Sequence, residues 1–357
     1  MARANKTKTM SMGGALKKGL IFLGLAAITF FVVFRSLDIN ELMRAVAHAR
    51  VEYLLIALMS MALFVVCEAL NIGRGLRIQG CSTSLKQRLL YASYGFFFSA
   101  ITPSSSGGQP LQLYAMNRDR INVAQGALAL IFELMSFQIA TLALGLWGLF
   151  THFSLISQAL GAGMAVVYVG IGVNAFVLLF LLSSIFSRKL ITAVVRFVIK
   201  GIGLFSKEKA EEWGCAVGRL LEQYFGGAEM VRTHPAMFCY ALITSLVQVV
   251  ALHSITYWVY LSLGLNSATF TTVLALQAVL YISVSTLPLP GAVGVNEGGF
   301  LLLYRVIFAG GLLGAGMLLA RLISFYLPVV LTGCGIAVQS MTSRGAKAQK
   351  ERDSATI

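Results

Sequence analysis

Two short polar segments interrupt the long apolar runs of this sequence. The first is residues 102–110 (TPSSSGGQP), and the second is residues 287–297 (LPLPGAVGVNE). Backbone N–H and C=O groups in hydrocarbon must be hydrogen-bonded, so a non-helical segment at membrane depth has to line a protein cavity or water. We call these segments the first and second breaks, and we expect the functional site to lie at them.

The composition indicates a membrane protein. Hydrophobic residues make up 57% of the chain, charged residues only 12%, and the mean hydropathy is +0.80, values outside the range of soluble domains. We expect an all-α polytopic protein of the cell membrane with about six spanning helices. Apolar windows long enough to span are residues 19–34, 53–72, 123–150, 160–185, 236–263 and 312–338.

The apolar pieces beside each break are too short to cross a membrane separately. Around the first break they are residues 89–101 and 111–116, and the second break has the same form. We therefore predict two re-entrant hairpins, over residues 89–116 and 271–308. The alternative is that each region is an ordinary spanning helix kinked at proline.

The positions of Lys and Arg predict the orientation, because these residues concentrate on the cytoplasmic side of short loops. If the breaks are re-entrant, 23 of the 28 basic residues fall on one face, and the opposite loops 152–158 and 265–269 contain none. Both termini are then cytoplasmic, and the hairpins open to opposite sides. Oppositely oriented broken hairpins are typical of secondary transporters built from an inverted repeat. The basic segments are residues 1–18, 73–90, 117–120, 187–235 and 344–352.

The chain is expected to form one transmembrane domain, residues 19–338. A basic N-terminus, residues 1–18, and a basic tail, residues 339–357, flank this domain on the cytoplasmic side. Residues 187–233 have an amphipathic helical pattern typical of a segment that rests on the membrane surface. Basic residues near an anionic leaflet contribute about 1 kcal/mol each, so the net charge of +14 requires no nucleic acid.

The residues of the first break suit an oxyanion. The serines at 104–106 offer hydroxyl groups, Gly107 and Gly108 allow close approach to backbone N–H groups, and Pro110 suits the first turn of a new helix. A helix N-terminus attracts phosphate. The same residue types are also ordinary turn formers and helix-packing residues, so both interpretations stay open.

Ionisable residues inside the apolar spans are costly and usually face a cavity or a partner. They allow internal ion pairs, and they also allow proton or cation coupling. For Glu133, a functional role and a structural hydrogen bond are both open. We expect Glu68 to extend toward the interface, Arg305 to lie at the outer interface, and His253 to be a packing residue. The residues concerned are Glu68, Glu133, His253, Glu297, Arg305 and Arg321.

The two breaks resemble the signature loops of the lysylphosphatidylglycerol synthase transmembrane (flippase-like) family, which includes the membrane half of MprF-type proteins. The resemblance covers nearly the whole chain in helix order, and Glu133 matches a family glutamate in the helix after the first loop. It implies movement of a phospholipid or another lipid-linked anion between leaflets, through a cavity shaped by re-entrant helices.

The chain departs from the family pattern at several positions. Many members have Arg after the first Gly-Gly pair, where residues 111–113 are Leu-Gln-Leu, and many have Gly-Gly where this chain has Gly291-Ala292. Charged residues often found just after the Glu133 position are replaced by Leu134 and Phe137. The sequence ends at Ile357 without the soluble aminoacyl-transferase domain of fused members, so we expect no lysylphosphatidylglycerol synthesis by this chain alone.

We therefore expect a transporter and not an enzyme: a lipid flippase that moves an anionic or aminoacylated phospholipid, or a lipid-linked precursor, between leaflets. The alternatives are an ion-coupled carrier of a small anion and a non-catalytic membrane partner of a lipid synthase. Membrane phospholipids are the expected partners, with no cofactor, metal or nucleic acid; oligomer formation stays open. The expected substrate-binding residues are Thr102, Pro103, Ser104, Ser105, Ser106, Gly107, Gly108, Gln109, Gln112, Tyr114, Glu133, Pro288, Pro290, Gly291, Gly294, Asn296, Glu297 and Arg321.

Overall fold

The structure is a computed structural model, and all of its described regular elements are helical, which confirms an all-α polytopic membrane protein. The described part contains five helices long and apolar enough to span a membrane, Val51–Ile78, Val123–Thr151, Phe153–Phe186, Pro235–Ser262 and Leu312–Gln339. They match five of the six expected spans. The expected span 19–34 and both basic termini lie outside the described residues, which are 47–102, 105–203, 218, 221–229, 232–285, 287, 289–308 and 311–339.

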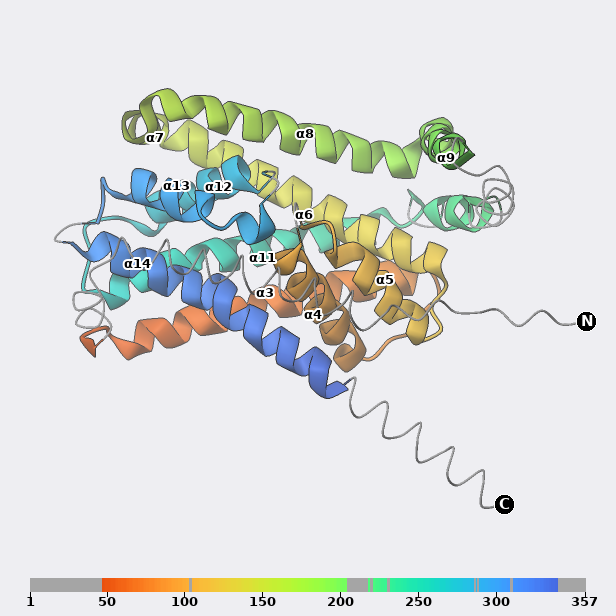
Figure 1. Cartoon of the computed structure of the whole chain (residues 1–357), viewed down its shortest axis with the longest axis horizontal. Coiled ribbons are helices and arrows are strands. Elements are labelled where there is room, and N and C mark those ends of the chain that lie inside the picture. The colour runs from red at the N-terminus through yellow and green to blue at the C-terminus, as the bar shows by residue number, and fades with distance from the viewer. Residues whose placement is uncertain are drawn as a thin grey trace, which may run out of the picture.

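Three long helices, α3 (Val51–Ile78), α6 (Val123–Thr151) and α11 (Pro235–Ser262), form the centre of the bundle (Figure 1). Small residues allow their close approach. A Cβ atom added to Gly75 of α3 would lie 2.8 Å from the Cα atom of Ala129 in α6. Helices in lipid associate through such close contacts, because the surrounding tails are as apolar as the side chains.

Two further long helical segments flank this centre. One comprises α7 (Phe153–Leu160), a short 3₁₀ turn and α8 (Met164–Phe186), and α8 lies along the outside of the bundle (Figure 1). The other begins as α14 (Leu312–Arg321) and passes through a π-helical turn, Leu322–Tyr326, before it continues to Gln339. Single π turns inside α-helices are frequent at functional sites.

The first break joins two short helices, α4 (Leu85–Ile101) and α5 (Gly108–Arg118), that form a hairpin. The hydroxyl of Tyr91, early in α4, donates a 2.6 Å hydrogen bond to the carboxylate of Asp119, just after α5. The hairpin therefore starts and ends at one end of the bundle. We call it the Asn122 end, because α6 begins there with Asn122 as its N-cap.

The second break joins α12 (Phe270–Val284) to α13 (Val295–Tyr304) in the same manner. The hydroxyl of Tyr304 donates to the backbone oxygen of Val273 at 3.1 Å, so the start of α12 meets the end of α13. A contact of 3.3 Å between the side chains of Thr272 and His152 places this hairpin at the opposite end of α6, the His152 end. Figure 1 shows the two hairpins at opposite ends of the bundle.

The hairpins share one design and differ slightly from the expected ranges. Each has a longer first arm and a shorter second arm, 17 and 11 residues in one, 15 and 10 in the other. Helix α4 begins at Leu85 and not at residue 89, because Ser84 and Gln87 form a reciprocal capping box that starts the helix earlier. Re-entry into the bilayer and an inverted repeat stay predictions.

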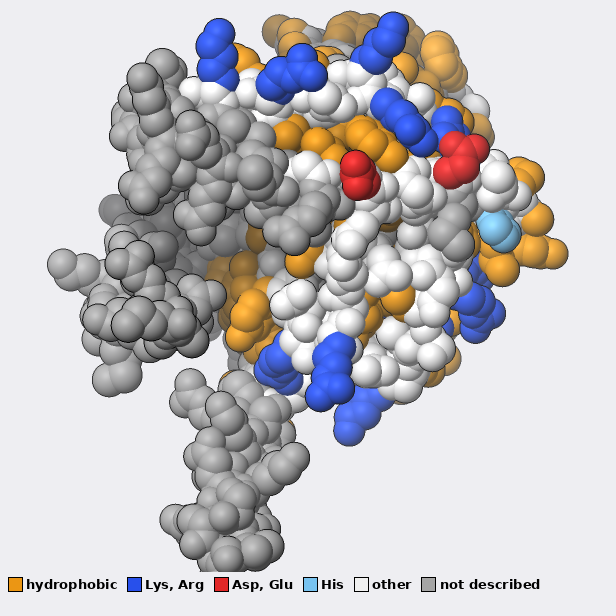
Figure 2. Space-filling model, turned by 90° about the vertical axis from the view of Figure 1, so that its right-hand side faces the viewer, with side chains coloured by type: hydrophobic (Ala, Val, Ile, Leu, Met, Phe, Trp, Pro, Cys, Tyr) orange, Lys and Arg blue, Asp and Glu red, His pale blue; other side chains and the backbone are white. Residues whose placement is uncertain are grey.

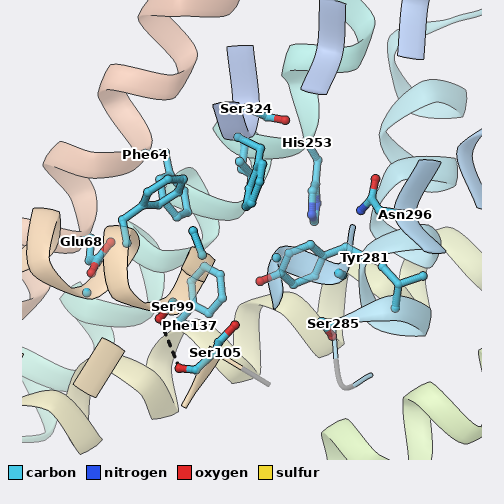
Figure 3. A pocket seen from close by; sticks show the side chains of 18 of the residues that line it. Phe64, Glu68, Ser99, Ser105, Phe137, His253, Tyr281, Ser285, Asn296 and Ser324 are labelled. Carbon is cyan, nitrogen blue, oxygen red and sulfur yellow. Dashed lines mark hydrogen bonds between the residues drawn. The ribbon is translucent and has the colours of Figure 1, made fainter. Parts of the chain in front are cut away.

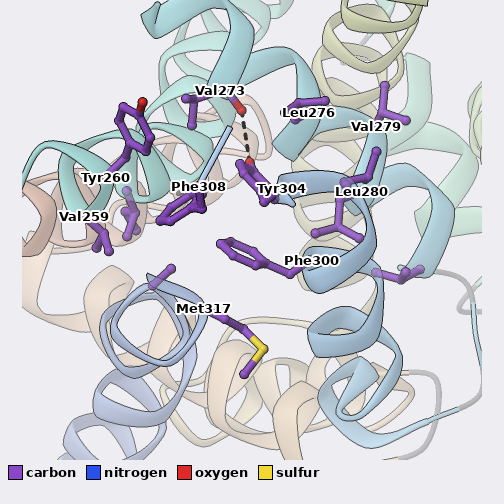
Figure 4. Close-up of a cluster of buried hydrophobic side chains, with 14 of the residues drawn as sticks. Val259, Tyr260, Val273, Leu276, Val279, Leu280, Phe300, Tyr304, Phe308 and Met317 are labelled. Atoms are coloured by element: carbon purple, nitrogen blue, oxygen red, sulfur yellow. Dashed lines mark hydrogen bonds between the residues drawn. The ribbon is translucent and has the colours of Figure 1, made fainter. Parts of the chain in front are cut away.

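A large apolar cluster holds the second hairpin in place (Figure 4). The rings of Phe300 and Tyr304 on α13 stack at 4.1 Å between centroids, and Phe308 packs edge-on against Tyr304. Buried residues of α11, α12 and α14, including Tyr260, Leu280 and Met317, complete the cluster. The second hairpin is therefore part of the apolar core.

Only parts of the predicted amphipathic segment, residues 187–233, are described. Helix α9 (Arg188–Gly203) forms its start, and residues 221–229 are helical. Tyr224 packs against Ala124 and Leu128 of α6 and donates a 3.1 Å hydrogen bond to the backbone oxygen of Ser184. This segment is thus attached to the Asn122 end of the bundle.

Candidate functional site

A cavity of about 320 Å³ lies where the tips of the two hairpins approach each other, between α3, α6, α11 and α14 (Figure 3). Both breaks contribute to its wall, as do apolar residues such as Phe64 and Phe137. The polar side chains that line it are Glu68, Ser99, Ser105, Gln109, Gln112, Glu133, Gln248, His253, Thr256, Gln277, Tyr281, Ser285, Asn296, Arg321 and Ser324.

Several of these polar residues were not predicted, although their spacing is informative. Gln277, Tyr281 and Ser285 follow one another at intervals of four, so they share one face at the end of α12. Gln248 and Thr256 are eight residues apart on α11 and lie on one side of that helix. A polar stripe along an otherwise apolar spanning helix usually faces the protein interior, and this signal identifies the cavity wall.

Thr102 closes the first break. Its hydroxyl donates to the backbone oxygen of Phe98 at 2.6 Å and accepts from the N–H of Gly107 at 2.8 Å. The N–H of Gly107 is therefore used within the loop and is not available to an oxyanion. Gly108 serves close packing, because an added Cβ atom would lie 2.1 Å from the hydroxyl oxygen of Ser99.

The serines of the first break have different surroundings. Ser105 lines the cavity with a left-handed backbone, φ 54°, and its carbonyl oxygen accepts a 3.3 Å hydrogen bond from the hydroxyl of Ser99 (Figure 3). Ser106 is exposed and does not line the cavity. Pro103 and Ser104 lie outside the described residues. Of the predicted oxyanion-binding serines in the described part, Ser105 is the one placed at the cavity.

Helix α5 presents two glutamines to the cavity, Gln109 and Gln112. The side-chain N–H of Gln112 donates to the carboxylate of Glu68 at 3.2 Å. Gly95 makes room for this amide, because a Cβ atom there would lie 2.3 Å from its nitrogen. Tyr114 points elsewhere: its side chain is 59% exposed and is absent from the cavity wall.

The second break is held by an ion pair between Glu297 and Arg321. The Nε atom of Arg321 donates to Oε1 of Glu297 at 2.6 Å, and both side chains are nearly buried. The second carboxylate oxygen accepts from the N–H of Gly294 at 2.6 Å, and Arg321 also donates to the backbone oxygen of Gly291 at 3.2 Å. Arg321 lines the cavity, whereas Glu297 mainly fastens the loop to α14.

The remaining residues of the second break shape its backbone. Gly291, Ala292 and Gly294 have φ values of 58°, 51° and 87°. Gly291, Ala292 and Asn296 line the cavity, and Gly294 does not. Pro290 begins a 3₁₀ turn of the backbone, and Pro288 lies outside the described residues. The segment Gly-Ala-Val-Gly thus adopts backbone conformations that favour glycine.

Replacing Ala292 with glycine should stabilise the protein. Ala292 occupies the left-handed region, where a residue with a Cβ atom costs roughly 1–2 kcal/mol relative to glycine. The expected gain is about 1 kcal/mol in the free energy of unfolding, measured by chemical unfolding in micelles. Ala315→Gly, in the middle of α14, is the matched control and should destabilise by roughly 0.5–1 kcal/mol. Equal effects of the two changes on the free energy of unfolding would contradict backbone strain at Ala292.

The structure corrects two expectations about ionisable residues. Glu68 does not extend toward the interface; it lines the cavity beside Gln112. His253 is buried as expected but lacks the hydrogen bonds of an ordinary packing histidine, since neither ring nitrogen has a partner in the described part of the chain. Arg305 donates to the backbone oxygen of Ala159 at the His152 end, and its position at the outer interface stays a prediction.

Glu133 lies in the cavity wall and is only 6% exposed. Its carboxylate has no hydrogen-bond partner among the described residues, so the structural hydrogen bond left open above is not found there. Two carboxylates without a basic partner therefore face this cavity, Glu68 and Glu133, while its arginine is paired with Glu297. The cavity can accommodate hydrogen-bonding groups and favours positive charge.

Comparison with known proteins agrees with this arrangement. The family model described as "Lysylphosphatidylglycerol synthase TM region" matches residues 19–332, which include both breaks and every residue that lines the cavity. A UPF0104 membrane protein of Archaeoglobus fulgidus is 23% identical over 322 residues, which are 89% of this chain and 96% of the relative. The chain belongs to the lysylphosphatidylglycerol synthase transmembrane-region family.

Proposed function

We propose that the protein is a lipid flippase, which moves a phospholipid or a lipid-linked precursor between the two leaflets of the cell membrane. The headgroup crosses through the central cavity while the acyl chains stay in lipid. The observation that carries this proposal is the position of the cavity, which is lined by the tips of two hairpins from opposite ends of the bundle. A site between broken helices of opposite orientation suits alternating access from both sides.

The distribution of charge supports an orientation with the Asn122 end in the cytoplasm. Figure 2, which looks onto that end, shows that Lys and Arg dominate its charged groups. At the His152 end, the described basic residues include Arg50, whose N–H bonds to the backbone oxygen of Ser262, and Arg305. Because basic residues favour the cytoplasmic side, we propose that both termini are cytoplasmic and that the first hairpin opens inward.

The charge of the cavity favours an aminoacylated headgroup over a purely anionic one. An ammonium group can bind the carboxylates of Glu68 and Glu133, which have no basic partner in the described part. Hydroxyl and amide groups of Ser105, Gln109 and Asn296 are available in the same wall for phosphate or ester oxygens. A headgroup that carries both a phosphate and an amine therefore matches the lining better than phosphate alone.

Replacing Glu133 with glutamine tests this role. The change keeps the shape of the side chain and removes a charge whose hydrogen bond to an ammonium group is worth about 1.5–3 kcal/mol. We expect leaflet exchange of a labelled aminoacyl-phosphatidylglycerol in reconstituted vesicles to fall about tenfold or more. Exchange of unmodified phosphatidylglycerol should change less.

Glu52→Gln is the control for this experiment. Glu52 pairs with Arg50 at the His152 end, is well exposed and lies far from the cavity wall. Its replacement should leave exchange at the wild-type rate. Equal exchange by wild type and Glu133→Gln, across a panel of lipids, would exclude the proposed role of Glu133. Exchange no faster than in protein-free vesicles would exclude the flippase.

A second candidate function is an ion-coupled carrier of a small anion. The observation that favours it is the same pair of unpaired carboxylates, which can bind a proton or a sodium ion during transport. Binding that is insensitive to acyl chains but sensitive to pH would support this carrier.

The third alternative is a non-catalytic partner of a lipid synthase. In that case the purified chain would exchange no lipid, and co-purification with a synthase would identify the role.

A further inference from the structure

The two unpaired carboxylates of the cavity lie on different helices. Glu68 belongs to α3 and Glu133 to α6, and both side chains line the same cavity. Glu68 accepts one hydrogen bond, from Gln112, and this neutral amide cannot balance a charge. Two carboxylates that share a site of low dielectric repel each other, and each unpaired buried ion is destabilising. One shared proton removes most of this cost.

An independent observation on the same cavity supports an occupant there. The imidazole of His253 is 1% exposed and faces the cavity beside the ring of Tyr281, at 5.2 Å between centroids (Figure 3). Neither of its nitrogens has a partner in the described part of the chain, and the side-chain oxygen of Gln248 is also unpaired. A buried polar group left without a hydrogen bond is destabilising, and a bound headgroup would offset this cost.

We propose that Glu68 and Glu133 hold one proton between them while the cavity lacks a headgroup, and that a cationic headgroup displaces this proton. Lipid movement in one direction is then coupled to proton movement in the other. The inference rests on the proposed flippase function and adds its energy source. It makes the flippase a proton antiporter.

The exchange balances in charge. Before the headgroup binds, two carboxylates and one proton carry a single net negative charge. Afterwards, two ionised carboxylates and one ammonium group again carry a single net negative charge. The displaced proton leaves to water on the side to which the cavity is open, so each half of the cycle moves one positive charge through the site.

The other titratable or charged groups of the cavity wall come from three elements. They are His253 of α11, Tyr281 of α12 and Arg321 of α14, and Arg321 forms a pair with Glu297 of α13, which does not line the cavity. Within that pair the two charges neutralise each other, and Tyr281 is a weak acid. His253 is the group that could take the proton in place of the carboxylates, so the test includes it.

A pH gradient across reconstituted vesicles tests the coupling. The probe is labelled lysyl-phosphatidylglycerol, initially equal in both leaflets, with one pH unit between inside and outside. Electroneutral one-for-one exchange should enrich the lipid about tenfold in the leaflet that faces the acidic side, since one pH unit is a tenfold proton ratio. The Glu133→Gln and Glu68→Gln proteins should leave the probe evenly distributed however long they act, and Glu52→Gln should behave as wild type.

The possible outcomes separate the two proposals. The wild-type protein could exchange the labelled lipid between leaflets and still leave it evenly distributed under the gradient, as in protein-free vesicles. That result would overturn the antiport but not the flippase. Absence of exchange at any pH overturns the flippase itself. If His253→Gln abolishes the enrichment while Glu68→Gln and Glu133→Gln keep it, the proton is held by the histidine and the carboxylate assignment is wrong. Enrichment that survives in His253→Gln and is lost in Glu68→Gln and Glu133→Gln supports the carboxylate assignment.

Discussion

Glu297→Gln is expected to destabilise the protein by about 3–5 kcal/mol, because it leaves the buried Arg321 guanidinium without its counter-charge. The glutamine oxygen can still accept the hydrogen bond from Gly294, so loss of the ion pair is the main effect. The second break should loosen from α14, and lipid exchange should fall with it. Chemical unfolding in micelles, followed by tryptophan fluorescence, measures the first effect, and vesicle exchange measures the second.

The double variant Glu297→Gln with Arg321→Gln provides the matched control. Removal of both charges is often close to neutral for a buried pair, whereas removal of one is not. We expect the double variant to regain most of the lost stability, a coupling that a double-mutant cycle quantifies. A Glu297→Gln protein as stable as wild type would show that the ion pair contributes little. Regained stability without regained exchange would assign Arg321 a direct contact with the lipid.

Gly291→Ala is expected to destabilise by about 2–4 kcal/mol and to impair lipid exchange. Two effects add at this position. Its φ of 58° is costly for alanine, by roughly 1–2 kcal/mol, and an added Cβ atom would lie 2.2 Å from the ring of Phe325. That ring cannot move freely, because the guanidinium of Arg321 stacks over it at 4.4 Å. Overpacking of this kind costs typically 1–3 kcal/mol.

Gly294→Ala separates the two effects, since Gly294 also has a positive φ, of 87°, but an added Cβ atom there meets no atom within 4 Å. This change should cost only the backbone strain. The combined variant Gly291→Ala with Phe325→Leu should recover part of the loss by removing ring atoms. If the combined variant is no more stable than Gly291→Ala, the contact with Phe325 is not significant. Unfolding midpoints in micelles provide the comparison.

Much of the fold could be predicted because its signals are local. The Pro/Gly/Ser segments mark the places where the chain leaves the helix, and the structure has non-helical backbone at both, with φ of 54° at Ser105 and 58° at Gly291. Length and hydropathy predicted the five long helices of the described part within a few residues for most ends. Such features depend on neighbouring residues alone.

The contents of the site were harder to predict, and Glu68 shows the reason. Sequence hydropathy ended the second span at residue 72, near the arginines, which placed Glu68 close to the interface. Helix α3 continues to Ile78, ten residues beyond Glu68. At 1.5 Å per residue this places the carboxylate about 15 Å from the helix end. Arg74 and Arg77 are therefore part of the helix, and the end of the apolar run at residue 72 is not the end of helix α3.

Pairing between distant helices is also invisible in one sequence. Three carboxylates and two arginines were recognised inside apolar spans, but any of them could have been partners. The structure pairs Arg321 with Glu297 and leaves Glu133 without a partner in the described residues, and this outcome depends on the rotation of each helix about its axis. His253 was assigned to packing because a lone histidine gives no information about the groups opposite it.

The unequal burial of the two hairpins bears on how the protein moves. The second hairpin is embedded in the large apolar cluster and fastened by an ion pair, whereas the first packs mainly against α3 and α6 through a smaller cluster. Exposing the large cluster would cost more free energy than a small rotation of α4 and α5. We therefore expect the two hairpins to move unequally despite their similar topology, with the second hairpin staying in place and the first hairpin moving.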